Sequence, residues 1–148
     1  MTPAHAILSG IAGAAVLNIA HQSLQAVTDD APRMEILGMR ALKGGLEAVG
    51  ADVPPRRELF PITLAADLLA NAGYYSLVGL AGPNKGILTG GALGLAAGVG
   101  AVALPGPMGL GNEPSNRTPQ TTAMTVGLYT LGGLAAGAVF TLLTRQSE

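Results

Sequence analysis

The chain has 148 residues, of which 49% are hydrophobic and only 11% are charged, and its net charge is −1 at pH 7. Soluble domains have about 25% charged residues, so this composition predicts an integral membrane protein that forms a single domain. The near-zero charge excludes a basic nucleic-acid-binding face, and the lack of cysteine excludes disulfides, thiolate catalysis and cysteine-ligated metals.

The first apolar segment covers about residues 4–27 and contains no charged side chain. It is long enough to cross a hydrocarbon layer of about 30 Å, so we predict a transmembrane helix. Its second half carries a polar stripe at helical spacing, formed by Asn18, His21, Gln22 and Gln25. We expect this stripe to face protein or water and not lipid.

Residues 28–60 form the most charged connection in the chain. An amphipathic helix is predicted over about residues 32–49, because its charged and apolar side chains project onto opposite sides of a helix. Its length and charge favour a position in the membrane interface over a crossing. The candidates for binding lipid headgroups are Arg33, Arg40, Arg56 and Arg57.

The second predicted span covers about residues 59–80 and is apolar apart from Asp67, Asn71 and a Tyr-Tyr-Ser group. Asp67 is the one acidic residue in any predicted span. A short turn then leads into the third predicted span, about residues 85–104. The turn is so short that these two spans are expected to form an antiparallel hairpin.

Glycine recurs at every fourth position of the third span, which places Gly86, Gly90, Gly94 and Gly98 on one helical face. In water each interior glycine would destabilise the helix by about 0.5–1 kcal/mol relative to alanine. In a membrane, small residues let two helix backbones approach closely. The fourth predicted span, about residues 121–144, repeats the pattern with Gly133 and Gly137. We therefore predict four transmembrane helices held together by glycine-rich packing seams of the glycine-zipper type.

The connection over residues 105–120 is rich in proline, glycine and asparagine, which predicts a surface or re-entrant loop without regular structure. This connection and residues 28–60 together carry six of the eight lysines and arginines. By the positive-inside rule both connections lie in the cytoplasm and both termini lie outside, across what we expect to be a bacterial inner membrane.

Antiparallel packing of the first two spans would bring two polar stripes together. His21 and Asp67 would lie at the same depth, roughly 10 Å inside one membrane face, with Asn18 and Asn71 one turn deeper. One interpretation is a proton- or ligand-binding site made of these residues and Gln22, since histidine changes its charge near neutral pH. The other interpretation is structural hydrogen bonding that fixes which helix faces meet.

Three functions stay open at this point. The first is a non-enzymatic one, an oligomeric or accessory subunit of a membrane assembly, with membrane lipids and further protein chains as partners. The second is an oligomeric channel or proton-coupled transporter that uses His21 and Asp67. The third is an enzyme acting on lipid near residues 29–43 and 112–117, although no catalytic residue can be assigned. We expect no cofactor, no metal and no nucleic acid, because the sequence contains none of the corresponding motifs.

Overall fold

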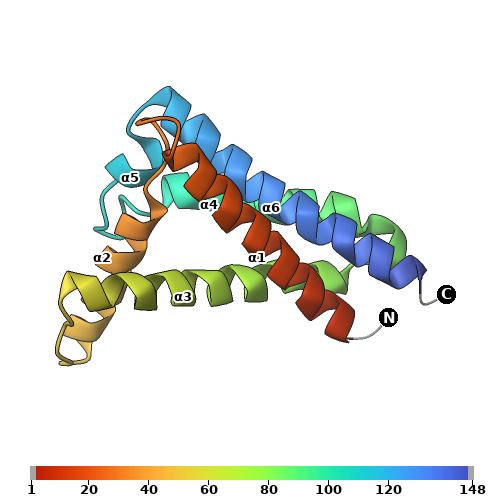
Figure 1. The fold of residues 1–148 in the computed structure, drawn as a ribbon, viewed down its shortest axis with the longest axis horizontal. Coiled ribbons are helices and arrows are strands. Elements are labelled where there is room, and N and C mark those ends of the chain that lie inside the picture. Colours follow the sequence, from red (N-terminus) through yellow and green to blue (C-terminus); the bar gives the residue numbers. More distant parts are fainter. Residues whose placement is uncertain (1–2, 147–148) are drawn as a thin grey trace.

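The computed structural model describes residues 3–146 and is built from helices over that range (Figure 1). Two short 3-10 helices, η1 (Ser76–Leu80) and η2 (Pro83–Lys85), connect the third α-helix to the fourth. The α-helices are α1 (Pro3–Gln25), α2 (Met34–Ala48), α3 (Arg56–Tyr75), α4 (Gly86–Ala103), α5 (Glu113–Asn116) and α6 (Pro119–Arg145). The prediction of an all-helical protein is confirmed over these residues.

Three helices in the described part of the chain are long and apolar enough to cross a membrane, namely α1, α4 and α6. This is the pattern of an integral membrane protein. Their limits lie within a few residues of the predicted spans 4–27, 85–104 and 121–144. Helix α6 starts before residue 121 because Pro119 suits a first turn, and because the Thr118 side chain accepts a hydrogen bond from the Thr121 N–H at 3.0 Å.

Helix α6 is the central helix of the fold, since it packs lengthwise against α4 and also against α1 (Figure 1). The buried residues of α4 are Gly86, Gly90, Gly94 and Gly98. A Cβ atom built on Gly94 would lie 2.5 Å from the carbonyl oxygen of Tyr129 on α6. The two backbones can approach this closely only because α4 carries no side chains on the face that meets α6.

Helix α3 differs from the predicted second span over residues 59–80. Its α-helix begins at Arg56, with Arg57 and Glu58 in the same turn, and ends at Tyr75, so it is not among the helices apolar enough to cross a membrane. It packs mainly on α1 and touches α4 only slightly, whereas α4 packs on α6. The predicted hairpin of the second and third spans is therefore wrong. The side-chain-free face of α4 is matched by glycines on α6, and α3 offers no such face.

Two tyrosines fasten the C-terminal end of α3 to the rest of the bundle. Tyr75 is fully buried and donates a hydrogen bond from its hydroxyl to the carbonyl of Tyr129 on α6 at 2.7 Å. The hydroxyl of Tyr74 donates to the carbonyl of Leu93 on α4 at 2.9 Å. The other end of α3 has no comparable attachment to α4 or α6, so the helices diverge towards α2 (Figure 1).

The connection over residues 105–120 contains the short helix α5, which corrects the prediction that it lacks regular structure. Pro114 and Ser115 in α5 are buried. Pro114 accepts a hydrogen bond from the Arg33 N–H at 2.7 Å, and Ser115 accepts one from the Thr125 hydroxyl at 2.7 Å. These contacts order a segment whose composition favours loops, and they tie it to the start of α2 and to α6.

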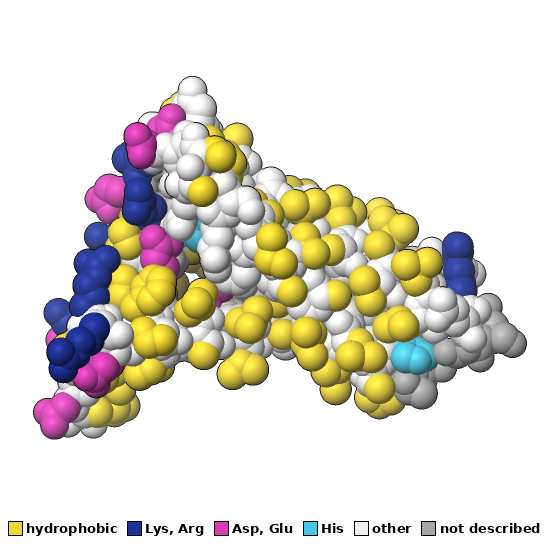
Figure 2. Space-filling model, viewed as in Figure 1, with side chains coloured by type: hydrophobic (Ala, Val, Ile, Leu, Met, Phe, Trp, Pro, Cys, Tyr) yellow, Lys and Arg dark blue, Asp and Glu magenta, His cyan; other side chains and the backbone are white. Residues whose placement is uncertain are grey.

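Charged side chains gather at one end of the molecule (Figure 2). Outside residues 28–58 and 113–117, the charged residues of the described chain are Asp67, Lys85 and Arg145. The exposed surface between the two ends carries mainly apolar side chains (Figure 2). The candidate functional site lies just inside the charged end.

Candidate functional site

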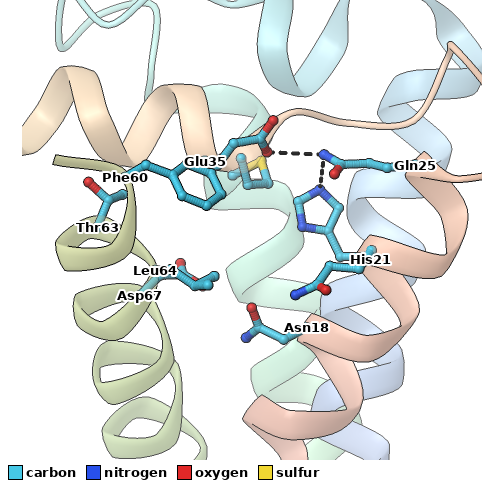
Figure 3. Close-up of a pocket in the computed structure, with 10 residues that line it drawn as sticks. Asn18, His21, Gln25, Glu35, Phe60, Thr63, Leu64 and Asp67 are labelled. Carbon is cyan, nitrogen blue, oxygen red and sulfur yellow. Dashed lines mark hydrogen bonds between the residues drawn. The ribbon is translucent and has the colours of Figure 1, made fainter. Parts of the chain in front are cut away.

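A pocket of about 350 Å³ lies between α1, α2 and α3, close to the charged end (Figure 3). Its polar lining comprises Asn18, His21, Gln22, Gln25, Glu35, Thr63 and Asp67, and its apolar lining comprises Met34, Phe60 and Leu64. The structure thus brings together four of the residues singled out from the sequence, namely Asn18, His21, Gln22 and Asp67.

His21 is held by the connection that follows α1. Its Nε2 lies 2.7 Å from the carbonyl oxygen of Pro32. The Gln25 amide nitrogen lies 2.9 Å from that same carbonyl, 3.0 Å from a Glu35 carboxylate oxygen and 3.2 Å from Nε2 of His21 (Figure 3). The Pro32 carbonyl oxygen is nearer to Nε2 than the Gln25 nitrogen is, and it can only accept a hydrogen bond. Nε2 of His21 therefore carries a proton and donates to Pro32, an assignment made from the hydrogen-bond network. The other ring nitrogen, Nδ1, faces the cavity and is the one that can accept a proton (Figure 3).

Asp67 projects from the middle of α3 towards α1, where Asn18 and His21 project towards it (Figure 3). Its carboxylate lies within interaction range of the Asn71 and Asn18 amides and of the His21 ring. Asn71 is buried one turn further along α3 and does not line the pocket. The expected meeting of two polar stripes is therefore present in the geometry, with Asp67 as its centre.

Several lining residues were not singled out as site residues from the sequence. Glu35 and Met34 come from α2, and they reach the pocket because the connection after α1 folds α2 across the gap between α1 and α3. Phe60 and Thr63 come from the first turns of α3. The position of Gln25 in the polar stripe was a signal for its role. Nothing in the spacing of Glu35 indicates that its carboxylate accepts a hydrogen bond from Gln25.

A second cavity, of about 500 Å³, lies between α2, α3, α4 and α6. It shares Met34 and Asp67 with the first pocket, so Asp67 borders both spaces. The α4 wall of this cavity is made of small residues, namely Ala96, Ala97, Gly100 and Ala101, and Leu104 follows directly after the helix. Asp67 is thus reached from two sides of α3.

The four arginine candidates for lipid headgroups are all exposed at the charged end. Arg40 donates to the Leu110 carbonyl at 2.5 Å and pairs with Glu113 at 3.6 Å, while Arg57 pairs with Glu58 at 3.6 Å. Arg33 is fixed through its backbone N–H, and Arg56 is exposed next to Arg57. The segments 29–43 and 112–117 therefore lie together. They are joined by the Arg40–Glu113 ion pair and by the hydrogen bond from the Arg33 N–H to the Pro114 carbonyl.

The chemistry available at the pocket is the binding of a proton or a polar group beside an apolar surface. Asp67 and Glu35 supply negative charge, His21 supplies a proton acceptor, and Asn18 and Gln22 supply amides that donate and accept. Among the residues that the structure describes, no three histidine, aspartate or glutamate side chains are grouped so as to hold a metal ion. No protein-family model, curated protein or solved structure matches the chain.

Proposed function

We propose that this chain is a small four-span membrane protein that works as a proton-coupled carrier, with the pocket between α1, α2 and α3 as its binding site. The observation that carries this proposal is the position of Asp67, which borders the pocket from the middle of α3 and faces His21. An ionisable side chain within a membrane-crossing helix is expensive to bury and typically marks a pathway for protons, ions or substrates.

The course of α3 supports its treatment as the fourth span. Helix α3 extends from the charged end of the molecule to the end where both termini lie (Figures 1 and 2). Helices α1, α4 and α6 connect the same two ends (Figure 1). The first turn of α3, with Arg56 and Arg57, then sits at the interface, where such side chains reach the headgroups. In this arrangement α2 lies in the interface, the charged end is cytoplasmic by the positive-inside rule, and both termini lie outside, in the inner membrane of a bacterium.

The glycine contacts between α4 and α6 support a lipid environment for these helices. In water, the interior glycines of α4 would disfavour a helix, and the close contact would bury little apolar area in return. In lipid the backbone is helical regardless, and small residues gain dispersion contacts by close approach. We propose that Gly86, Gly90, Gly94 and Gly98 form a transmembrane packing seam with Gly133 and Gly137.

Proton movement in proteoliposomes tests the carrier proposal. A pH gradient is imposed across vesicles that enclose a pH-sensitive dye, and its decay is compared for the wild type, Asp67→Asn and protein-free vesicles. The control variant is Glu58→Gln, which removes an exposed acid of α3 outside the pocket. We expect faster decay with the wild type and with Glu58→Gln, and the protein-free rate with Asp67→Asn. A wild type indistinguishable from protein-free vesicles, or an unchanged Asp67→Asn, would overturn the proposal.

A second candidate is the role of an oligomeric or accessory subunit, and the cavity between α3 and α4 favours it. Its α4 wall of small residues leaves room for a further helix at membrane depth. The chain has no cysteine, so Ala97→Cys provides a single thiol in this wall. Gly127→Cys provides a control on α6, at a position where an added Cβ atom would meet no neighbour within 4 Å. Crosslinking in native membranes should then join Ala97→Cys, but not Gly127→Cys, to a second chain. Absence of any crosslinked product would reject this role.

A further inference from the structure

The pocket contains two carboxylates from different helices and no lysine or arginine. Glu35 comes from α2 and Asp67 from α3, and both belong to the lining. Neither takes part in an ion pair with a lysine or arginine in the described part of the chain. The groups near them are the neutral amides of Gln25, Asn18 and Asn71 together with the His21 ring. The pocket therefore holds two carboxyl groups that have no lysine or arginine partner, and a bound cation would supply one.

The rest of the lining is suited to an organic cation. The ring of Phe60 stands on the α3 side of the pocket, across from His21 and Gln25 of α1 (Figure 3), and an aromatic face attracts ammonium groups. Phe60 is 43% exposed and Leu64 is 36% exposed, so the apolar side of the pocket continues to the outer surface of α3. The volume of about 350 Å³ is within the range of about 300–1,000 Å³ that small-molecule sites occupy.

From these observations we infer that the pocket binds an amphiphilic primary amine. This inference depends on the proposed carrier function, because it names the substrate class of the same site. The ammonium group lies in the pocket that Asp67 and Glu35 both line, where charge-assisted hydrogen bonds to carboxylate oxygens replace part of its hydration shell. The apolar tail leaves past Phe60 and Leu64 into the surrounding lipid. Anionic headgroups are disfavoured here by the two carboxylates.

The amine has two possible sources, a free amphiphilic amine and the headgroup of an aminophospholipid. Their shared chemistry is a primary ammonium group on an apolar tail, and a single experiment separates them. The protein is placed in nanodiscs of phosphatidylglycerol, or of phosphatidylglycerol mixed with phosphatidylethanolamine. A twelve-carbon α,ω-diamine that carries a dansyl group on one nitrogen and a free primary amine at the other end is titrated into each, and empty nanodiscs of the same composition give the background. The matched control probe is the same molecule with its amine acetylated, which keeps the tail and removes the charge.

We expect saturable binding of the amine probe in phosphatidylglycerol nanodiscs and none of the acetylated probe. Asp67→Asn and Glu35→Gln should each raise the Kd at least about tenfold, since each removes a charged partner. Glu58→Gln should leave the Kd unchanged, because Glu58 lies outside the pocket. Competition by phosphatidylethanolamine would identify the lipid headgroup as the occupant, and undiminished probe binding would identify a free amine.

Equal binding of the two probes, no saturable binding above empty nanodiscs in phosphatidylglycerol, or an unchanged Kd in both pocket variants would overturn the inference. The comparison of the two probes uses the wild type, so it stands even if a variant fails to fold. Proton movement that requires Asp67 but occurs without amine binding would reject the amine and retain the proton carrier. Absence of both proton movement and amine binding would reject the carrier and the amine site.

Discussion

Gly98 of α4 lies against Val126 of α6 so closely that a Cβ atom built on Gly98 would come 2.7 Å from the Val126 Cα. Backbone atoms cannot give way as a flexible side chain can. The variant Gly98→Ala therefore forces α4 away from α6, and we expect it to destabilise the protein by about 1–3 kcal/mol, as overpacking does. Loss of helical circular dichroism on heating in detergent micelles measures this.

The matched control for Gly98→Ala is Gly127→Ala. Gly127 lies in α6, and a Cβ atom there would have no neighbour within 4 Å. Alanine is a better helix former than glycine by about 0.5–1 kcal/mol, so the control should be neutral or stabilising. Equal melting temperatures for the two variants would show that the α4–α6 contact is looser than the structure indicates.

Tyr75 offers a second test, because it connects α3 to α6. Its hydroxyl donates to the Tyr129 carbonyl at 2.7 Å, and its ring is fully buried beside Leu17 and Ala136. Tyr75→Phe removes one hydrogen bond and should lower the stability by about 0.5–1.5 kcal/mol. Tyr75→Ala also leaves a cavity and should cost about 3–5 kcal/mol. If Tyr75→Phe melted at the wild-type temperature, the hydroxyl would not be holding α3 in place.

Thr63 has a buried hydroxyl for which the structure shows no hydrogen-bond partner, and the residue is only 4% exposed. Valine has the same shape without the hydroxyl, so Thr63→Val should raise the stability by about 1 kcal/mol or more by removing an unsatisfied buried group. The matched control is Thr125→Val, because the one hydrogen of the Thr125 hydroxyl has two carbonyl acceptors within reach, Ser115 at 2.7 Å and Thr121 at 2.8 Å.

Opposite shifts in melting temperature are expected for these two threonine variants, upward for Thr63→Val and downward for Thr125→Val. Thermal unfolding of both in the same detergent measures the difference. A loss of stability in Thr63→Val equal to that in Thr125→Val would mean that the Thr63 hydroxyl is satisfied in the folded protein.

The sequence allowed most helices to be predicted, because long apolar stretches and helical periodicity are local properties. The meeting of His21 and Asp67 could also be anticipated from their depth in two helices that pack together. The helix pairs could not all be predicted: the short turn at residues 82–84 favoured a hairpin of α3 and α4, whereas the glycine faces pair α4 with α6. Pairing depends on the fit of surfaces far apart in sequence, which loop length does not fix.

Only part of the pocket could be predicted from the sequence, because the rest depends on contacts between segments that are not adjacent in the sequence. Glu35 enters the site because Pro32 turns the chain so that its carbonyl meets His21 and Gln25. This connection has no periodicity to interpret. Helix α5 was missed because its short sequence is rich in loop-forming residues, and its order comes from contacts with Arg33 and Thr125.

The proposed carrier requires α3 to cross the membrane and Asp67 to lie within it, and cysteine accessibility tests this requirement most directly. The chain lacks cysteine, and a Cβ atom built on Gly44 of α2 or on Gly82 after η1 would have no neighbour within 4 Å, so each position accepts a single cysteine. A membrane-impermeant maleimide is applied to spheroplasts before and after permeabilisation. We predict that Gly82→Cys reacts in intact spheroplasts and that Gly44→Cys reacts only once the membrane is opened. Reaction of both positions under the same condition would place the two ends of α3 on one side and contradict the proposed carrier.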